Sequence, residues 1–471
     1  MGHRYLLVFG NPNSEEPTPR PVTPSRRQLG GLTRASASAM LTGDSGVIAS
    51  PAGARTAGAV GAGAGPSCLA RRRGRRVATR RTAGKRARVG IVGVGLTRFG
   101  VRSDASLREL AFEAAKACLE DATVRLADVE SMIVAVASDE LSFSLQPSAQ
   151  VVDYLGFYPR PSFRAEGACA SGSMAIRAGW MNVASGLADL VLVVGVEKMT
   201  EVPTPTVTEV LGRAGDTVWE YPFGMTFPGY YAMLARAHMA KYGTTEEQLA
   251  AVAVKNHHYG ALNPYAHMQK EITLDTALSS RVVADPLKLY DCCLISDGAA
   301  AVLLATETTA KRLRVDPIWL TGLGLGTGTL NIAHRADLTT LEASTEAAGQ
   351  AYEMAHVTPR DIDVAVVHDC FTIAEIVAYE DLGFCPRGEG GQLIEERRTY
   401  IEGEIPVNVD GGLKSKGHPI GATGVAMAVE IVKQLRGEAG AGRQVPGAEI
   451  GLSHNVGGSG QHSVVHIFSR S

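Results

Sequence analysis

Two stretches of the chain, 233 residues apart, are close copies of one another. Residues 113–130 read EAAKACLEDATVRLADVE, and residues 346–363 read EAAGQAYEMAHVTPRDID. Each stretch runs into a β-rich apolar segment, MIVAVA after the first and VAVV after the second. This repeat predicts an α/β protein built as two halves on one plan. Aligned without a gap, the stretches share seven identical residues, which in the first copy are Glu113, Ala114, Ala115, Glu120, Ala122, Val124 and Asp128.

The segments around the repeat extend this plan. Residues 89–95 (VGIVGVG) predict a strand, and the apolar spacing around 106–121 predicts the helix after it. A looser echo relates CASGSMA (169–175) to IGATGVAMA (420–428), since each is a turn of small residues that leads into a helix. In both halves, a loop with Gly and Ser or Thr would therefore present side chains at a helix N-terminus.

These segments divide the chain into an N-terminal half, 89–310, and a C-terminal half, 311–471. Residues 201–285 are richer in aromatic residues, Pro and His, which indicates an insertion such as a lid or a substrate-binding loop domain. GVGLTR (93–98) begins like a dinucleotide-binding fingerprint, but Arg98 occupies the third glycine position. We therefore do not expect NAD binding.

Composition and charge describe a large folded body that follows a basic leader. The 471 residues are 45% hydrophobic and 20% charged, enough for an extensive core. Residues 1–88 carry 16 Lys and Arg against 3 Asp and Glu, whereas the rest carries 30 against 45. An acidic body offers no broad nucleic-acid surface. No apolar run approaches the roughly 18 residues that a membrane span needs.

The leader, residues 1–88, is rich in Ala, Gly, Pro and Arg and lacks sustained periodicity, so we expect it to be disordered and dispensable. Three origins are open: a start codon placed too far upstream, an organelle transit peptide, or a basic arm that binds RNA or a membrane. The C-terminal Ser469-Arg470-Ser471 is not the peroxisomal S-K-L signal.

The cysteines indicate a reducing compartment. Their number is odd, no C-x-x-C occurs, and the chain is large, so neither a disulfide scaffold nor a zinc site is expected. A cytoplasmic location follows, with a mitochondrion or plastid as the alternative if the leader is a transit peptide. The seven are Cys68, Cys118, Cys169, Cys292, Cys293, Cys370 and Cys385.

A predicted buried strand ends on chemically active residues. In VAVVHDCF (364–371), the apolar run stops at His368, and Cys370 follows two positions later. Residues two apart in a strand point to the same side, so both side chains would face one pocket. A metal half-site, a redox thiol, an acid/base pair, and a buried Cys beside a core His all remain open for this pair.

Two further segments carry a thiol and an imidazole. EGACASGSMAI (166–176) places Cys169 just before a helix, where the helix dipole and backbone N–H groups are expected to lower its pKa. GGLKSKGHPIGATG (411–424) holds His418 before a proline in a glycine-rich loop, which fixes its backbone and lets a ligand approach. Each residue alone is as well explained by core packing, but together they supply the nucleophile, acid/base and oxyanion donors of acyl transfer.

With these motifs together, the sequence resembles the thiolase superfamily, most closely the sterol-carrier-protein type thiolases and the archaeal and bacterial acetyl-CoA acetyltransferases. The resemblance covers about residues 89–471. It implies an α/β thiolase fold, with two similar halves in a layered αβαβα arrangement and an inserted loop domain. The motifs that carry it are GACASGS (167–173), TFPGYYAM (226–233), NPYAHMQ (263–269), ISDGAAA (295–301), HDCF (368–371) and GGLKSKGHPIGATG (411–424).

The resemblance also implies a role for each catalytic residue. Cys169 would be the nucleophile that takes up the acyl group. His418 would activate Cys169 and help polarise a thioester oxygen. His368 stands where many thiolases have the Asn of an N-E-A-F motif, and with His418 it would bind the enolate oxygen. The backbone N–H groups of Cys169 and Gly457 would form a second oxyanion hole.

One departure from the family pattern concerns the second thiol. Many thiolases place an acid/base Cys in a C-terminal C-x-G-G-G segment, but in HNVGGSG (454–460) Asn455 occupies the Cys position. Asn does not exchange protons at neutral pH, so Cys370 would act instead, as in the sterol-carrier-protein branch. Cys293, beside a region that lines the pantetheine channel in relatives, is a substrate-binding candidate together with Phe227 and Asn455.

The expected function is that of a CoA-dependent thiolase, which condenses acyl-CoA or cleaves 3-oxoacyl-CoA through an acyl-Cys169 intermediate. Acyl-CoA and CoA are substrates, and neither a permanently bound cofactor nor a metal is expected. The resemblance implies a homodimer or homotetramer and a partner with an OB fold and a zinc ribbon. The alternatives are a ketosynthase-like condensing enzyme, which needs no base such as Cys370, and a non-catalytic lipid- or acyl-CoA-binding subunit.

Overall fold

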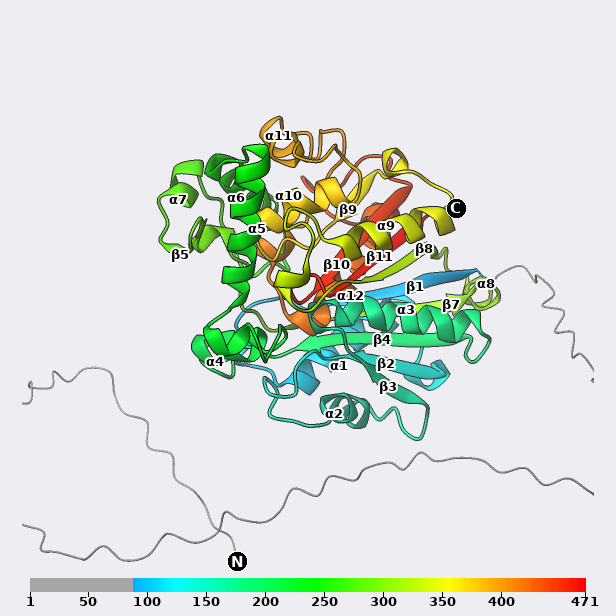
Figure 1. The fold of residues 1–471 in the computed structure, drawn as a ribbon. Coiled ribbons are helices and arrows are strands. Elements are labelled where there is room, and N and C mark those ends of the chain that lie inside the picture. The colour runs from blue at the N-terminus through cyan, green and yellow to red at the C-terminus, as the bar shows by residue number, and fades with distance from the viewer. Residues whose placement is uncertain (1–87) are drawn as a thin grey trace, which may run out of the picture. The chain divides into compact units, whose positions relative to one another are not determined.

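The repeated stretch folds in the same way twice (Figure 1). The computed structural model describes residues 88–471, and the predicted leader lies outside the described residues apart from Arg88. The N-terminal half opens with β1 (Val89–Leu96), α1 (Leu107–Asp121) and β2 (Ser131–Ala135). The C-terminal half opens with β8 (Ile318–Thr327), α9 (Glu342–Ala355) and β9 (Val364–Val366). In both halves a short 3-10 turn connects the helix to the strand, so the duplicated sequence encodes a duplicated strand–helix–strand unit.

The strand order repeats as well. The remaining strands of the large sheet are β3 (Ser162–Ala165), β4 (Leu190–Glu197), β7 (Gly298–Thr306), β10 (Ile450–Gly457) and β11 (His462–Ser469). The N-terminal half is ordered β2-β4-β7-β1 and the C-terminal half β9-β10-β11-β8, each with one parallel pair followed by antiparallel pairs. Strand β3 extends the N-terminal half only, beside β2. The halves join where β1 pairs with β8, at Gly90 with Trp319 and Ile91 with Ile318.

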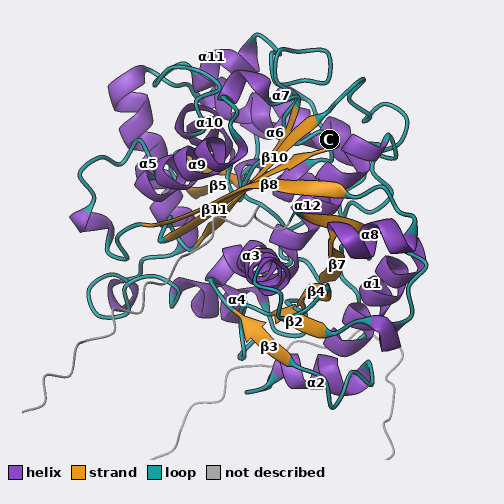
Figure 2. Ribbon diagram, turned by 90° about the vertical axis from the view of Figure 1, so that its right-hand side faces the viewer, coloured by secondary structure: helices purple, strands orange, loops and turns teal. Residues whose placement is uncertain are grey.

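Although the sheet is continuous through β1 and β8, two central helices lie between its two halves (Figure 2). Helices α3 (Ser171–Ala184) and α12 (Ile420–Arg436) lie between the strands of the two halves. On the outer faces lie α1 and α2 (Pro147–Tyr154) on one side, and α9 and α10 (Thr372–Asp381) on the other. The order is therefore helix, sheet, helix, sheet, helix, and the predicted αβαβα layering is confirmed.

The central helices cross closely because each presents a glycine to the other. A Cβ on Gly172 would lie 2.7 Å from the backbone N of Val425. A Cβ on Gly424 would lie 2.3 Å from the backbone N of Ser173. Gly172 and Gly424 belong to the two small-residue motifs that echo one another in the sequence. These motifs therefore bring the N-terminal ends of α3 and α12 together.

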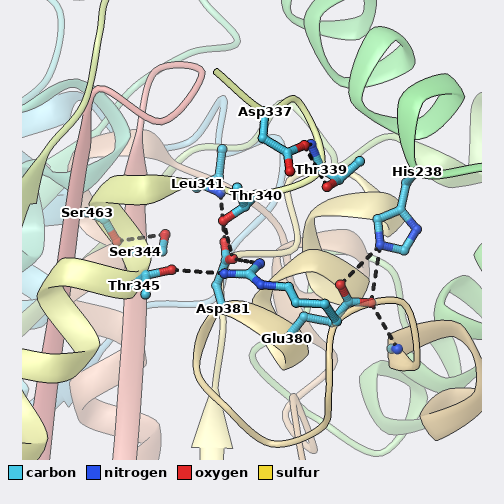
Figure 3. Close-up of polar contacts among 12 residues, drawn as sticks. His238, Asp337, Thr339, Thr340, Leu341, Ser344, Thr345, Glu380, Asp381 and Ser463 are labelled. Atoms are coloured by element: carbon cyan, nitrogen blue, oxygen red, sulfur yellow. Dashed lines mark hydrogen bonds and ion pairs between the residues drawn. The ribbon is translucent and has the colours of Figure 1, made fainter. Parts of the chain in front are cut away.

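The segment between β4 and β7 is largely helical and docks on the C-terminal half (Figure 3). The Nε2 atom of His238 lies 3.2 Å from each carboxylate oxygen of Glu380, and the Nζ atom of Lys241 lies 2.7 Å from an oxygen of Asp337. The elements of this segment are α4 (Thr204–Gly212), α5 (Phe227–Tyr242), α6 (Glu246–Ala261), α7 (Leu274–Leu278), β5 (Val282–Ala284) and β6 (Leu287–Lys288).

Two short helices complete the fold, α8 (Glu307–Leu313) and α11 (Gly390–Glu395). Among residues 88–471, none of the helices combines the length and the apolar character that crossing a membrane requires.

Candidate active site

Cys169 sits on a tight elbow between β3 and α3. It belongs to a single 3-10 turn, Ala168–Ala170, and Ala168 just before it has a φ of +51°, which is unfavourable for a residue with a side chain. Ser171 holds this elbow, because its Oγ accepts from the N–H of Gly167 (3.0 Å) and donates to the carbonyl of Ala168 (2.6 Å). The Cys169 thiol is thereby fixed at the start of α3.

His418 is held at the start of α12 with a defined tautomer. Gly417 before it has a φ of +111°, and a Cβ there would lie 2.6 Å from Ser296 Oγ. The Nδ1 atom of His418 lies 2.7 Å from Thr423 Oγ1, and that hydroxyl donates to the carbonyl of Pro419 (3.0 Å). Since the hydroxyl proton is already used, His418 Nδ1–H donates to Thr423. The Nε2 atom then carries a lone pair that can accept a proton.

His368 has the opposite arrangement. The side-chain amide of Asn455 donates from Nδ2 to His368 Nδ1 over 3.1 Å. An Nδ1 atom that accepts a hydrogen bond has no proton, so the proton of neutral His368 is on Nε2. The two histidines therefore differ in function: His418 offers an acceptor nitrogen, whereas His368 offers an N–H donor. Asn455, which the sequence indicates both as the replacement of the family's cysteine and as a substrate-binding candidate, sets this difference.

The three side chains converge. The sulphur of Cys169 and one ring nitrogen each from His368 and His418 all lie within 4.8 Å of one another. The two imidazole rings meet edge to face, with centroids 5.1 Å apart and an interplanar angle of 81°. Both histidines are buried, and Cys169 is partly exposed. The N-terminal half thus supplies the thiol and the C-terminal half both imidazoles.

Burial keeps this group neutral. It raises the pKa of the Cys169 thiol to about 12, even though hydrogen bonds from the backbone N–H groups of Gly458 and Cys169 itself act in the opposite direction. It lowers the pKa of His418 to about 3, and burial, together with neighbouring His418 and His454, lowers the pKa of His368 well below its usual value. The prediction that the helix start would lower the pKa of Cys169 was therefore wrong, because desolvation outweighs the N–H donors. At neutral pH a neutral thiol faces two neutral imidazoles.

The second thiol lies in the same cluster. Cys370 is buried, and its carbonyl accepts from the N–H of Cys293 (2.9 Å). The ring of Tyr231 stacks on that of Phe371, the residue after Cys370, with centroids 4.6 Å apart, and its hydroxyl donates to the carbonyl of Gly458 (3.5 Å). Burial raises the pKa of Cys370 well above its usual value, and the negative charges that Cys293 and Cys169 can carry raise it further. The segment after β9 therefore brings His368 to Cys169 and places a second buried thiol, Cys370, two residues further on.

Models of two domain families match the chain. The thiolase N-terminal domain matches residues 89–308, and the domain described as thiolase C-terminal domain-like matches residues 324–470. The chain belongs to the thiolase family. The fold and the family that the sequence predicts are thereby confirmed.

Among the relatives of this thiolase is the acetyl-CoA acetyltransferase of Methanothermobacter thermautotrophicus, 49% identical over 383 residues, which are 81% of this chain and 99% of the relative. Sterol carrier protein 2 of Bos taurus is 36% identical over 79% of this chain and 70% of its own length. A solved structure titled "Ltp2-ChsH2(DUF35) aldolase" superposes with a TM-score of 0.71 at 28% identity, over 81% of this chain and 98% of that one.

Asp369 ties the two catalytic segments of the C-terminal half together. It lies between His368 and Cys370 in the sequence and is buried. Its carboxylate accepts from the backbone N–H groups of Leu413 (2.6 Å) and Lys414 (3.0 Å), in the loop that leads to His418. It also accepts from the side-chain amide of Asn256 (2.7 Å). One carboxylate thus positions the thiolase's strand end against its glycine-rich loop.

One of the other predicted binding residues, Phe227, lines a cavity next to Cys169. A cavity of about 580 Å³ is lined by Cys169, Phe227 and Ile420, with charged side chains such as Arg164 and Glu166. Its partly apolar wall suits an acyl-CoA better than a free ion.

Backbone geometry explains why residue 457 is a glycine and places Cys293 next to Cys370. Gly457 must be glycine, because a Cβ there would lie 2.2 Å from the carbonyl oxygen of Gly167. Cys293 adjoins Cys370 through its backbone N–H, whereas the sulphur of Cys292 contacts the carbonyl of Lys288 (3.4 Å). The predicted role of Cys293 in substrate binding stays a prediction.

Cys169, His368 and His418 also approach one another closely enough to hold a metal ion. The expectation that the reaction needs no metal stays an expectation.

Proposed function

We propose that this CoA-dependent thiolase transfers acetyl groups, joining two molecules of acetyl-CoA into a 3-oxoacyl-CoA and cleaving the product in reverse. One observation carries the proposal: the thiol of Cys169 faces two imidazoles whose hydrogen bonds give them opposite tautomers. Claisen chemistry needs both a proton acceptor for the nucleophile and a donor for the enolate oxygen. The identity of 49% to an acetyl-CoA acetyltransferase supports the acetyl group as substrate.

In the first half-reaction, Cys169 attacks the thioester carbon of acetyl-CoA. Its proton passes to the free Nε2 of His418 as the S–C bond forms, since the neutral pair does not ionise beforehand. The backbone N–H groups of Cys169 and Gly457 would hold the thioester oxygen. The bond to CoA then breaks, and the leaving CoA thiolate takes the proton of Cys370. Acyl-Cys169, protonated His418 and a Cys370 thiolate remain.

In the second half-reaction, the Cys370 thiolate removes a proton from the α-carbon of another acetyl-CoA. The C–H electron pair moves toward the thioester oxygen, which accepts hydrogen bonds from Nε2–H of His368 and Nε2–H of protonated His418. The enolate carbon attacks acyl-Cys169, the S–C bond breaks, and the Cys169 sulphur recovers its proton from His418. Every group returns to its starting state, and neither a metal nor a resident cofactor takes part in these steps.

The experiment is an assay with three arms: acetyl-CoA alone, acetoacetyl-CoA with CoA, and malonyl-CoA with acetyl-CoA. A thiolase condenses in the first arm and cleaves in the second. Condensation only when malonyl-CoA is present would instead indicate a ketosynthase-like enzyme, whose enolate arises by decarboxylation. Binding of acyl-CoA without turnover in any arm would indicate a non-catalytic subunit. Either of these outcomes would overturn the proposal.

Assembly and location are further parts of the proposal. We propose a homodimer or homotetramer, together with a partner protein of the OB-fold, zinc-ribbon kind. The superposed aldolase, whose title names ChsH2(DUF35) beside Ltp2, supports a partner in general terms. The six cysteines of the described residues are all free, which supports a reducing compartment such as the cytoplasm. Light scattering of the purified protein, alone and with a candidate partner, measures the assembly.

A further inference from the structure

Glu375 is a buried carboxylate that the proposed steps leave without a role. It lies in the first turn of α10, and its side chain is 0% exposed. One of its oxygens, Oε2, accepts from two side-chain amides, those of Asn256 and Asn408, each over 2.7 Å. The other, Oε1, accepts from Nζ of Lys255 and from the hydroxyl of Tyr379. Four donors therefore surround a carboxylate that has no exposed surface.

The two amides hold the chain on either side of His368. The Oδ1 atom of Asn408 accepts from the backbone N–H of Val367 (2.9 Å), the residue before His368. The Nδ2 atom of Asn256 donates to the carboxylate of Asp369 (2.7 Å), the residue after it. Both asparagines are buried. His368 therefore stands between two anchored residues, and both anchors meet at the same carboxylate oxygen.

The orientation of each amide depends on that carboxylate. In Asn408, the bond from Nδ2 to Glu375 turns Oδ1 toward the N–H of Val367. In Asn256, Nδ2 faces two carboxylates, whereas Oδ1 is buried and has no hydrogen-bond partner among residues 88–471. Reversing either amide would place an oxygen against the Glu375 carboxylate, which is unfavourable because both groups only accept. Glu375 therefore fixes the direction in which both asparagines point.

Lys255 offsets the charge of Glu375. It precedes Asn256 on α6, in the segment between β4 and β7, and its side chain is also buried. Its Nζ donates in addition to the carbonyl of Val407 (2.8 Å). Burying a lone carboxylate is costly, and a paired, hydrogen-bonded cation reduces that cost. Two consecutive residues of α6 thus support the segment that carries His368, one through its charge and the other through its amide.

We propose that Glu375 is a positioning residue for His368: through the two asparagine amides it holds the imidazole where its Nε2–H meets the enolate oxygen. This inference rests on the proposed function, in which His368 acts in the second half-reaction. The hydrogen bonds that Asp369 accepts from the loop leading to His418 do not involve Glu375. Loss of this carboxylate should therefore slow the enolate step and leave acylation of Cys169 nearly unchanged.

The first variant is Glu375→Gln, measured on the full chain. Gln keeps one acceptor oxygen, so its NH₂ group must oppose either the asparagine amides or the ammonium of Lys255. Exchange of the acetyl-CoA methyl protons with deuterated solvent should fall about 10- to 100-fold, because displacing a catalytic group by about 1 Å costs up to about 100-fold in rate. The burst of acetyl-enzyme, followed by mass spectrometry, should stay close to the wild-type value.

Two double variants separate the hydrogen bonds from the buried charge. Lys255→Met with Glu375→Gln is neutral, and without the ammonium the Gln can turn its oxygen toward both asparagines. Lys255→Met with Glu375→Met is equally neutral but offers the asparagines no acceptor. We expect exchange in the first double variant to be about tenfold or more faster than in the second. Equal exchange rates in the two, with both folded by thermal unfolding, would overturn the proposal.

The matched control is Glu380→Gln. Glu380 is a buried carboxylate on the same helix, and it also contacts the segment between β4 and β7, through His238 (Figure 3). Its other hydrogen bond comes from the backbone N–H of Gly390 (3.0 Å) and not from the two asparagines. This variant should leave burst and exchange at wild-type values.

His368→Ala, run in parallel, separates this inference from the function on which it rests. If His368→Ala loses exchange while Glu375→Gln keeps the wild-type rate, the role of Glu375 fails and the proposed function stands. The same conclusion holds if burst and exchange fall equally in Glu375→Gln. If His368→Ala exchanges at the wild-type rate, His368 is not the enolate donor, and the role of Glu375 fails with it.

Discussion

The start of α3 and the start of α12 occupy equivalent places in the two halves, yet they carry different chemistry. Both are turns of small residues, and both helices approach one another through Gly172 and Gly424. One turn carries Cys169, a neutral thiol, and the other carries His418, a neutral base. Duplication of a half therefore provides two helix N-termini side by side. A thiol at one and an imidazole at the other give a nucleophile and its base.

The segments that follow the equivalent strands β2 and β9 also carry different chemistry. After β2, the backbone N–H groups of Ala137 and Ser138 donate to the buried carboxylate of Glu197 over 2.8 and 3.3 Å. That carboxylate also accepts from the N–H of Gly421 in α12 (2.9 Å), so the N-terminal half fixes the start of the helix after His418. After β9, the equivalent strand end carries His368 and Cys370 instead. One strand end supports the site, and the other supplies its reactive groups.

The largest expected effect comes from changing the reactive strand end. Cys370→Ala should slow condensation about 10²–10⁴-fold, because a positioned acid/base group is lost. Acetyl-Cys169 should still form and accumulate, since His418 still activates Cys169. His368→Ala should slow the enolate step through loss of about 3 kcal/mol of oxyanion stabilisation. The measurements are burst and proton exchange, and wild-type exchange in Cys370→Ala would make Cys370 a packing residue.

A somewhat smaller effect is expected when the tautomer of His368 is reversed. In Asn455→Asp the carboxylate only accepts, so His368 would donate from Nδ1 and present a lone pair at Nε2. Losing one oxyanion donor costs about 10²-fold in kcat. The control, Asn182→Asp, changes an amide on α3 that donates to the carbonyl of Ala178. Equal rates for wild type and Asn455→Asp would show that the tautomer does not matter.

A further prediction concerns how the rate of alkylation of Cys169 depends on pH. Because burial raises its pKa to about 12, its alkylation by iodoacetamide should accelerate about tenfold for each pH unit from 6 to 9, in step with the thiolate fraction. Peptide mapping after timed alkylation measures this slope. A plateau near pH 7 would mean that Cys169 and His418 form an ion pair at rest, contrary to the neutral pair described above.

The smallest expected effect is on the free energy of unfolding and concerns the crossing of α3 and α12. A Gly→Ala change at the crossing should lower this free energy, whereas one at an exposed helix position should raise it. Gly172→Ala should lower the free energy of unfolding by about 1–3 kcal/mol, because its Cβ would overlap the backbone of α12. Gly349→Ala, on the exposed face of α9 with nothing within 4 Å, should raise it by about 0.5–1 kcal/mol. Denaturant unfolding of both variants compares them. Equal effects would mean that the central helices do not need this close approach.

Much of the fold follows from local sequence, and less of the site does. The repeat at 113–130 and 346–363 predicts the two halves, and the elements around it form as expected. The partners that position the site lie far away in sequence: Asn455 bonds to His368, 87 positions away, and Glu197 accepts from the N–H of Gly421, 224 positions away. Periodicity and motifs do not report such contacts. The pKa of Cys169 was predicted in the wrong direction because a motif shows the helix start but not the burial.

Isotope mapping of the acetyl-enzyme tests the central claim most directly. After incubation with heavy-isotope acetyl-CoA and trypsin digestion, the cysteines of the site fall on separate peptides: Cys169 on 165–177, Cys293 on 289–311 and Cys370 on 361–387. Cys385→Ala, which removes the other cysteine of the last peptide, should label like the wild type. We predict the label on 165–177, and its loss in Cys169→Ala. Label on 289–311 or 361–387 in the wild type would contradict the account.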